Sequence, residues 1–587
     1  MNAETLDITA NKKLFIGDAT KAGKLTVENA KLNNGGMVFL DPAWKDGVTI
    51  SDASGLAVKN ITSADGAYVV GRNSVLALGA DLQTAEEKFA KTGTSWGKSD
   101  VSAATYIASP IDVTHGSLTV NGALVDDASV ATTSPAVGSV SFAAHSLLIV
   151  DGATALTGPV ITGVSTANID KNAKLYIDDA KKGETYHILG GTTKGWAGDS
   201  IISNNSLFKF TNANDSTGYT LTTSIKSMNE AFGVGQVPGS NAYDAALDSQ
   251  NEGDAAYDFI MAAADSRVNP SQAAQISALS SAAAMSELAG TAHGTYIANH
   301  LLTASVADHM SLANAKTHDQ DLWAHYIHTK ETVDGLAIAN FGANYDAKYN
   351  GIVVGTDLYQ KGTTTFGAAL TYVDGDSNGH TLAAQTKNDA TYYGMSLYGR
   401  ITKDDRALIG DISYLHGKND ITQHNSGETL SAKAKTDTFS IGLRAEKSFQ
   451  VGNGKWVPYA GFRYMHLSAG AYTNSIGMHY DGDDMNLWML PIGVTYSTEV
   501  KRGGWTLRPM AEIGYVWNLG DRDGTQTVSL SGVSDSFGFA VADSGSYLGR
   551  LKIEAQKANT TYGIGYEYQK GDTTKANRWT ANVNWRF

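Results

Sequence analysis

Cysteine is absent from this sequence of 587 residues. Its absence excludes disulfide bonds, thiolate metal sites and a cysteine nucleophile. Charged residues are scarce, at 18% of the chain, and they sum to a formal net charge of −14. Because a nucleic-acid-binding protein needs a basic face, this balance argues against that class of protein.

Long hydrophobic runs are also missing. The sequence contains no run of about eighteen apolar residues, so it predicts no membrane-spanning helix. Its first residues, MNAETLDITANKKLFIG, lack the apolar segment of a signal peptide. If the protein is exported, we expect a signal peptide upstream of Met1.

Glycine and tyrosine are abundant, with 62 and 27 residues respectively. Together with many Thr, Asn and Ser residues and little charge, they favour strands and turns. The length corresponds to about three or four domains. Three regions of different composition follow one another along the chain.

The first region, up to about residue 225, repeats short β-prone segments that close with Gly, Asn or Asp. Examples are KLFIGD (13–18), KLTVEN (24–29), LAVKN (56–60), VLALG (75–79), SLTVNG (117–122), SLLIVDG (146–152) and KLYIDD (174–179). Strands this short cannot bury a core singly, but they can stack as the rungs of a β-solenoid. A β-sandwich is the alternative. The stretch DLQTAEEKFAKTG (81–93) predicts a short helix that loops out of the stack.

The second region, residues 241–318, is rich in Ala, Ser, Met and Leu. Because Ala has the highest helix propensity and β-branched residues are few here, the region favours helix. Pro270, preceded by Asn269, predicts a break between two helical pieces.

The third region, from about residue 319, consists of segments with apolar residues at every second position, which is the period of a strand with one apolar face. Twelve such segments are found, near 321–330, 350–360, 363–373, 389–401, 406–416, 435–448, 455–467, 485–498, 504–518, 546–556, 560–569 and 578–587. In several of them aromatic residues stand at both ends of the apolar face. This order is typical of transmembrane β-barrels, in which two aromatic girdles border a lipid-facing band.

The connections between these segments alternate between short and long. Even-numbered connections are built around QKGTT, TKDDR, QVGNGK, KRGG and KANT, whereas the odd-numbered ones are longer. An up-and-down outer-membrane barrel has this asymmetry, with tight periplasmic turns and longer outside loops. The last segment, RWTANVNWRF, places Trp585 and Phe587 on its apolar face, and we expect this strand to pair with the first one.

The polar face of each barrel strand should then line the lumen. Seven charged residues stand on this polar face of their strands, namely Arg444, Glu446, Arg463, Arg508, Glu512, Arg550 and Glu554. The expected fold class is therefore all-β with a helical linker: an N-terminal β-solenoid, an Ala-rich helix and a C-terminal antiparallel transmembrane barrel of twelve strands.

This organisation resembles that of the type Va autotransporters. NPSQAAQISALSSAAAMSELAGTAHGTYIANHLL resembles the linker helix of that family, LWMLPIGVTYS a barrel strand, and WTANVNWRF the terminal strand. The resemblance implies a solenoid passenger over 1–240, a helical linker over 241–318 that threads the lumen, and a barrel over 319–587. It also implies that Trp585 and Phe587 form the barrel-assembly signal.

The same resemblance implies the surroundings of the protein. The barrel would sit as a monomer in outer-membrane lipid, and the barrel assembly machinery and periplasmic chaperones would assist its insertion. The passenger would face a host or surface ligand of unknown identity, and no nucleic acid would be bound. No cofactor, catalytic residue or metal site is expected.

Several motifs suggest chemistry that their context argues against. Residues 375–379, GDSNG, match the G-x-S-x-G pattern of serine hydrolases and overlap the first half of a calcium loop. We expect them in a loop between two barrel strands, without the helix that either motif needs. Asn299 and Asn314 are available for the self-cleavage known in some family members, but no matching cleavage motif surrounds them.

Six histidines cluster around the linker: His293, His300, His309, His318, His325 and His328. Their spacings form no i, i+4 metal pair on a helix. His325 and His328 should point to opposite faces of one strand, because their separation is odd. We expect most of this cluster to be solvated side chains that face the lumen.

Three functions are compatible with these observations. The first is an outer-membrane autotransporter that displays its passenger as an adhesin or surface antigen and is not an enzyme. The alternative is the passenger of a secreted protease or esterase whose catalytic part is missing or unrecognised. A channel without secretion is the third possibility, which the helix predicted to fill the lumen argues against.

Overall fold

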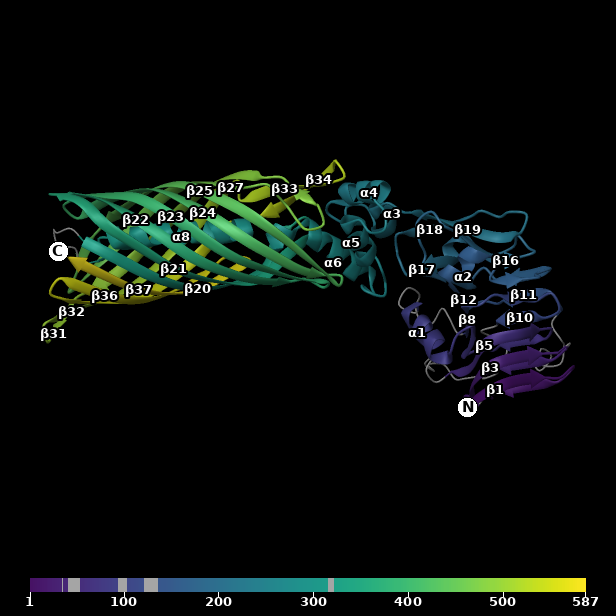
Figure 1. Ribbon diagram of the computed structural model, residues 1–587. Helices are drawn as coiled ribbons and strands as arrows, with labels where there is room; N and C mark the ends of the chain where they lie inside the picture. The colour runs from purple at the N-terminus through teal and green to yellow at the C-terminus, as the bar shows by residue number, and fades with distance from the viewer. Residues whose placement is uncertain are drawn as a thin grey trace. The chain divides into compact units, whose positions relative to one another are not determined.

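The computed structural model describes residues 1–18, 20–33, 35–40, 53–92, 103–120, 136–314 and 321–586. Its contacts divide the chain into two compact units. Unit 1 comprises Met1–Gly233 with Ala264–Gln275, and unit 2 comprises Val234–Ala263 with Ile276–Phe587. Figure 1 shows the strands of both units and the helices.

Unit 1 is built from short strands that stack into three sheets. The first sheet contains, in order, β1 (Asn2–Ile8), β3 (Lys24–Leu32), β5 (Ser54–Ala64), β7 (Ser74–Leu78), β8 (Ala103–Ile107), β12 (Ser146–Asp151), β15 (Lys174–Asp178) and β17 (Ile201–Ser203). The second contains β14 (Thr166–Ile169), β11 (Ser139–Phe142), β10 (Ser117–Val120), β6 (Ala67–Val70), β4 (Met37–Leu40) and β2 (Lys13–Ile16). The third contains β18 (Phe208–Asn212), β19 (Gly218–Ile225), β16 (Thr185–Gly190), β13 (Ile161–Thr162) and β9 (Ile111–Asp112).

Strands of the first two sheets pair in parallel with the corresponding strand of the next repeat. Parallel pairing requires a crossover between partners, which the rest of each repeat supplies by passing through the other sheets. The predicted solenoid-like arrangement is therefore confirmed, and the sandwich alternative is wrong. Among the described strands of this unit, the antiparallel pairs are β16 with β19 and β18 with β19, late in the unit.

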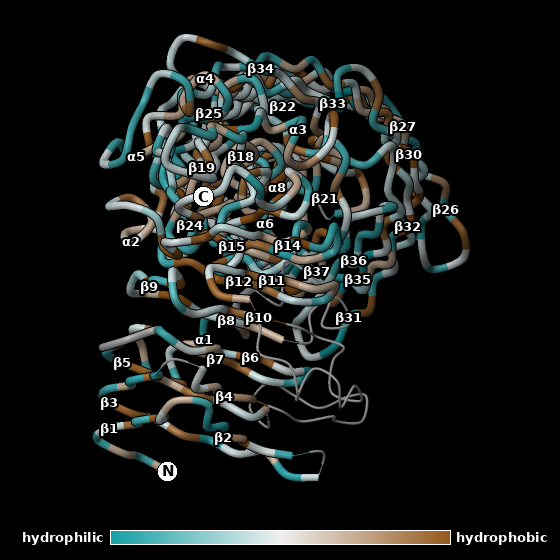
Figure 2. Tube along the Cα trace, turned by 90° about the vertical axis from the view of Figure 1, so that its right-hand side faces the viewer, coloured by the Kyte–Doolittle hydropathy of each residue, from teal (hydrophilic) through white to brown (hydrophobic). Residues whose placement is uncertain are grey.

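The strands of unit 1 are apolar on both faces where a second layer covers the sheet. All five residues of β7, SVLAL, are buried. Leu82 and Ala85 of α1 (Leu82–Thr92) pack on the outer side of this sheet, against a cluster that includes Ala77 and Tyr106. The helix predicted over 81–93 is thus confirmed, and it shields sheet residues that would otherwise face water. Hydrophobic and hydrophilic stretches alternate along these strands in Figure 2.

The remaining helices are short apart from one. They are α2 (Gly152–Thr157), α3 (Met228–Phe232), α4 (Ser240–Ser249), α5 (Ala255–Ala263), α6 (Gln272–Ala283), α7 (Met285–Leu288) and α8 (Thr291–Met310). The predicted break at Pro270 is confirmed, because it falls between α5 and α6. Among the described residues, every helix is too short or too polar to cross a membrane.

The third region forms a closed antiparallel barrel of twelve long strands, as predicted. In order they are β20 (Asp321–Ile338), β21 (Phe341–Lys361), β22 (Thr364–His380), β23 (Ala384–Lys403), β24 (Arg406–Asn425), β25 (Glu428–Lys447), β27 (Gly454–Ala469), β30 (Asp483–Thr498), β32 (Trp505–Gly520), β35 (Gly545–Lys557), β36 (Thr560–Lys570) and β37 (Thr574–Arg586). The last strand pairs with the first along its whole length, from Leu322 opposite Trp585 to Val333 opposite Thr574.

The connections at one end of the barrel differ from the expectation. The first, third and fifth were expected to be long loops, but β20 to β25 continue as strands and end in tight hairpins. The alternation of buried and exposed residues continues into these extensions. In these extensions the backbone N–H and C=O groups stay hydrogen-bonded to the neighbouring strand, which favours a continued strand over an irregular loop. GDSNG (375–379) consequently lies inside β22 and not in a loop.

The seventh and ninth connections do contain extra structure. The seventh carries β28 (Tyr472–Thr473) and β29 (His479–Tyr480), and the ninth carries β33 (Asp523–Leu530) and β34 (Val533–Ala540). β29 pairs with β33, and β34 reaches β20 through Ile338 and Phe539. These short strands therefore continue the wall around the extended end of the barrel.

Candidate functional site: the barrel interior

Helix α8 lies inside the barrel (Figure 1). It packs most closely against β21 to β25 and β27, and polar side chains join it to β20, β32 and β35. Most of its twenty residues are buried, and they occur on all sides of the helix. A helix that is buried all round is enclosed by protein on every side. The interior is therefore occupied by a segment of the same chain.

The first turn of α8 is held by His293. One ring nitrogen, Nδ1, lies 2.6 Å from the carbonyl oxygen of Val541, and Nε2 lies 3.1 Å from Oε1 of Glu331. Because the carbonyl can only accept, Nδ1 must donate its hydrogen. The imidazole ties the helix to β20 and to the segment that follows β34.

Close packing holds the next turn. A Cβ atom placed on Gly294 would lie 2.6 Å from the hydroxyl oxygen of Tyr392 and 3.1 Å from that of Tyr349. The hydroxyl of Thr295 is 2.7 Å from that of Thr436, and Asn299 donates to Thr438 at 3.0 Å. Small side chains let the helix backbone approach the wall, and short polar side chains of the helix and the wall form hydrogen bonds with each other there.

An aromatic cluster holds the last turn. His309 stacks on Trp323, with ring centroids 4.6 Å apart, and its Nε2 lies 3.1 Å from Oδ1 of Asp357. The same carboxylate accepts from the hydroxyl of Tyr398 at 2.9 Å, and the indole of Trp323 donates to that hydroxyl at 2.8 Å. Four buried side chains from α8, β20, β21 and β23 therefore form one connected network.

Cations and one acid hold the C-terminal end of α8. Arg400 donates to the carbonyl of Met310 at 3.0 Å, which suits the partial negative charge at a helix C-terminus. Beyond the helix, Glu446 accepts from the hydroxyl of Ser311 at 3.1 Å and from the backbone N–H of Leu312 at 2.7 Å. Arg444 in turn donates to Glu446 at 2.7 Å.

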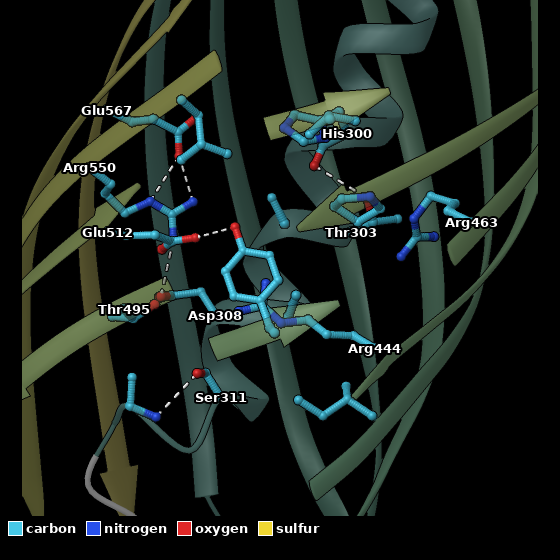
Figure 3. Close-up of a pocket in the computed structure, with 18 of the residues that line it drawn as sticks. His300, Thr303, Asp308, Ser311, Arg444, Arg463, Thr495, Glu512, Arg550 and Glu567 are labelled. Atoms are coloured by element: carbon cyan, nitrogen blue, oxygen red, sulfur yellow. Dashed lines mark hydrogen bonds and ion pairs between the residues drawn. The ribbon is translucent and has the colours of Figure 1, made fainter. Parts of the chain in front are cut away.

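A cavity of about 120 Å³ lies beside the second half of α8, bordered mainly by β24 to β35. Figure 3 shows the charged residues that surround it. Asp308 of the helix pairs with Lys552 at 2.6 Å and lies 3.6 Å from Arg550. Arg550 also contacts Glu567 at 2.5 Å and Glu512 at 3.3 Å. The helix is thus joined to the opposite wall by alternating charges.

The seven sequence-predicted lumenal residues lie in the interior, and six of them form three pairs. Arg444 and Glu446 pair with each other near the end of α8. Glu512 and Arg550 belong to the cavity network. Arg508 pairs with Glu554 at 3.2 Å, and both are almost fully buried.

Arg463 stands apart from these groups. Its guanidinium makes a two-pronged pair with Asp411, at 2.6 and 2.9 Å, and also donates to Ser440 at 3.2 Å. The hydroxyl of Ser440 donates to Asn299 of α8 at 3.3 Å, so Arg463 supports the helix through one intermediate residue.

Sequence reasoning missed several partners in these networks, among them Asp411, Lys552 and Glu567. The period-two pattern could have identified them, because inward-facing residues recur at every second position of a strand. Lys552 lies two residues from Arg550 and two from Glu554, on the same face of β35. The acidic partners also stand at inward positions of their strands. The identity of each pair, however, depends on strand register.

Two further predictions about the interior need correction. His293, His309 and His325 were expected to be solvated, but they are only 4%, 2% and 4% exposed. They fill space between α8 and the wall, and two of them pair with carboxylates. The hydroxyl of Ser377, within GDSNG, is buried and donates to the carbonyl of Ala289, so it cannot serve as an accessible nucleophile. As predicted, His325 and His328 lie on opposite faces of β20.

The outer surface of the barrel is apolar. Trp585 of the terminal strand is 51% exposed on this surface, next to the first strand. The second residue of the predicted assembly signal, Phe587, lies outside the described residues. Ile513, Leu551 and Ile564 are each at least 64% exposed and face the same way. This band has the character of a lipid-facing surface.

Comparisons with known proteins agree with this geometry. Residues 322–569 match the family model described as Autotransporter beta-domain. None of the curated proteins compared with the sequence matches it.

Three solved structures illustrate the similarity of the barrel. The translocator domain of autotransporter NalP from Neisseria meningitidis is 18% identical, with 51% of this chain and 97% of that chain covered and a TM-score of 0.40. The β-domain of the Bordetella autotransporter BrkA is 16% identical, covering 46% and 100%, with a TM-score of 0.35. The transport unit of autotransporter AIDA-I from Escherichia coli is 14% identical, covering 50% and 99%, with a TM-score of 0.38.

The family match falls within the twelve-stranded barrel, which has an apolar exterior and a charged interior filled by α8. Residues 322–569 therefore form an autotransporter β-domain, which places the barrel in the outer membrane.

Proposed function

We propose that the chain is an outer-membrane autotransporter that displays its own N-terminal unit at the cell surface by type V secretion. The observation that carries the proposal is the course of α8 through the barrel. Its first turns contact Glu331 and Thr436, in the extended half of the wall, and the residues after its last turn contact Glu446, near the short turns. The chain before α8 thus emerges at the extended end.

The direction of the barrel supports display outside the cell. The turns between β21 and β22 and between β23 and β24 span only two residues, whereas the seventh and ninth connections, at the extended end, are longer and carry β28, β29, β33 and β34. In outer-membrane barrels short turns face the periplasm and the longer connections face outward. With that orientation, residues before Thr291 lie on the external side, and the chain after Met310 returns to the periplasmic end of β20.

The displayed unit is proposed to act as an adhesin or surface antigen and not as an enzyme. Three stacked sheets offer long, regular surfaces, which suit recognition of an extended ligand. The ligand would be a host or surface molecule. The barrel would insert as a monomer with the help of the barrel assembly machinery and periplasmic chaperones, without nucleic acid or cofactor.

Protease treatment of intact cells tests display. In cells producing the full chain, added protease should remove unit 1 and leave a protected fragment of the size of the barrel. Cells carrying an internal periplasmic marker provide the control, because that marker must stay intact. Protection of unit 1 in intact cells, combined with cleavage after lysis, would show that it is not displayed.

Adherence and hydrolysis assays separate the two roles of the displayed unit. Cells producing the full chain should bind host cells or each other more than cells producing residues 276–587 alone. They should not gain protease or esterase activity. Hydrolysis that depends on unit 1, without a change in adherence, would support the secreted-enzyme alternative instead.

A further inference from the structure

Two strands on the outside of the barrel repeat one short motif. Residues 326–330 read YIHTK in β20, and residues 414–418 read YLHGK in β24. In each motif the Tyr, His and Lys point outward, while Ile327 and Leu415 between them are buried inside. Both motifs stand where the apolar outer band gives way to polar residues toward the extended end.

The neighbouring strand completes each motif in the same way. In the first cluster, Asn350 lies opposite His328, and Lys348 lies opposite Lys330. Oδ1 of Asn350 accepts from Nδ1 of His328 at 2.7 Å, and the hydroxyl of Tyr326 lies 3.5 Å from the same oxygen. The amide therefore fixes the ring so that Nε2 is left for another contact.

The second cluster uses a carboxylate in place of the amide. In β25, Asp437 lies opposite His416, and Lys435 lies opposite Lys418. Asp437 accepts from Nδ1 of His416 at 2.9 Å and also from the hydroxyl of Tyr414. Its charge is thus engaged by two donors of the cluster, below the pair of lysines.

Each cluster holds two exposed lysines directly across from each other. Cβ atoms of such cross-strand pairs are about 5 Å apart, and like charges there destabilise a sheet. Within the described part of the chain, none of these four ammonium groups lies within ion-pair distance of a carboxylate. Lys418 contacts only the face of the Tyr393 ring, at 5.9 Å.

Two other outward lysines of the wall, Lys433 and Lys387, are arranged differently. In the rung beyond the second cluster, Lys433 lies opposite Asp420 and pairs with it at 3.3 Å. Beside the first cluster, Asp376 lies 3.8 Å from Lys387, although it stands opposite Lys348. Lys433 and Lys387 thus have ion-pair partners, whereas the four lysines of the two clusters have none within ion-pair distance among the described residues.

A third copy of the motif lacks the cations. Residues 464–468 read YMHLS, and Asn486 of the next strand accepts from both Tyr464 and His466. Ser468 takes the place of the lysine, and Asp484 lies opposite it. The Tyr-His-acceptor group thus occurs without lysines, so the paired lysines of the other two clusters need their own explanation.

We propose that these two clusters each bind the phosphate group of a phosphorylated lipid in the outer leaflet. Two ammonium groups are suitable partners for a phosphate monoester, and the imidazole adds an Nε2–H donor when the ring is protonated. The Tyr side chains lie at the level of the aromatic girdle, where headgroups begin. An anion held between the lysines removes the repulsion between them, and the acyl chains of the same lipid cover the apolar band below.

Lipid retention by the purified full chain in non-ionic detergent tests this proposal. The probe is bisphosphorylated lipid A, and native mass spectrometry counts the bound molecules. The wild-type protein should retain two, and the variants K330A/K348A and K418A/K435A should each retain one. Because a lysine near an anionic lipid surface contributes about fivefold to affinity, each double variant should weaken its own site by about 25-fold.

Three comparisons make the result specific. The control K433A, in the same hairpin as the second cluster, should retain both lipids. The charge-preserving variant K418R/K435R should bind like wild type, which separates loss of charge from a folding defect. Dephosphorylated lipid A should not be retained, and heat-modifiable migration on gels should confirm that every variant is folded.

Several results would overturn the proposal. Both double variants could retain two lipids, or K433A could lose as much binding as K418A/K435A. Equal retention of the dephosphorylated probe would show that acyl chains alone are recognised. Inorganic phosphate that displaces the lipid at an equal concentration would show a site for a free anion.

Discussion

At the scale of single residues, the interior of the barrel depends on paired charges. Arg550 joins Glu512 and Glu567 of the wall to Asp308 of the helix, and its own side chain is 22% exposed. Removing one member of such a network leaves the opposite charges without compensation, which costs more than the pair itself contributes.

Arg550→Met should therefore lower the free energy of unfolding by about 3 kcal/mol. Urea unfolding of the barrel in lipid vesicles measures the change. Arg406→Met serves as the control, because that side chain is 72% exposed and its pair with Asp405 should contribute less than about 1 kcal/mol. Similar losses from the two variants would contradict a structural role for the interior network.

A second residue-scale prediction concerns the faces of β32. Ile513 is 67% exposed on the outer surface, whereas the adjacent Glu512 is 8% exposed and accepts from Tyr459 at 2.8 Å. Ile513→Arg should cost about 2–4 kcal/mol if the position is near the bilayer midplane. Glu512→Gln keeps the shape and an acceptor oxygen, and Arg550 keeps its pairs with Asp308 and Glu567, so this change should cost less. The same unfolding measurement compares the two variants, and equal costs would contradict the assigned faces.

At the scale of elements, α8 and the wall are fitted to each other. Helix propensity alone predicts that Gly294→Ala raises the free energy of unfolding by about 1 kcal/mol, because Gly is a poor helix former. The new Cβ would meet the hydroxyl of Tyr392 at 2.6 Å, and that ring is only 1% exposed. Overpacking of this kind costs about 1–3 kcal/mol, so packing should outweigh propensity.

We therefore expect Gly294→Ala to lower the temperature at which the folded band disappears on a semi-native gel. Ala304→Met on the same helix borders the cavity, so it should leave that temperature nearly unchanged. Stabilisation by Gly294→Ala would show that the helix is loosely held at this turn.

At the scale of the whole molecule, the helix decides whether the barrel conducts. A barrel of twelve strands encloses more space than its own side chains fill. Here α8 occupies that space and leaves a cavity of about 120 Å³. The extended wall and its hairpins add length to the interior without closing it.

Deleting Thr291–Met310 should open a water-filled pore. In planar bilayers the intact protein should conduct weakly and the deletion variant strongly, in both cases at the same protein density. Gly294→Ala, which keeps the helix, is the matched control and should stay close to the intact protein. Strong conductance from the intact protein would show that the helix does not close the lumen.

Sequence alone determined the parts of this protein that depend on local periodicity. Alternation of period two revealed all twelve barrel strands and showed that residues such as Arg508 and Glu512 face inward. The pattern is visible in the sequence because one face of each strand meets an apolar surrounding and the other a polar one. The β-prone repeats likewise revealed the stacked strands of unit 1, and the Ala-rich stretch revealed the helices.

Only the tertiary structure decided which of these residues meet. Asp308 and Lys552 are 244 positions apart, and their contact depends on the register of the strands and on the rotation of α8 in the lumen. The burial of His293 and His309 and the extension of β20 to β25 as hairpins depend on the same long-range arrangement. Local patterns carry no information about it, because pairing partners are selected by closure of the whole barrel around the helix.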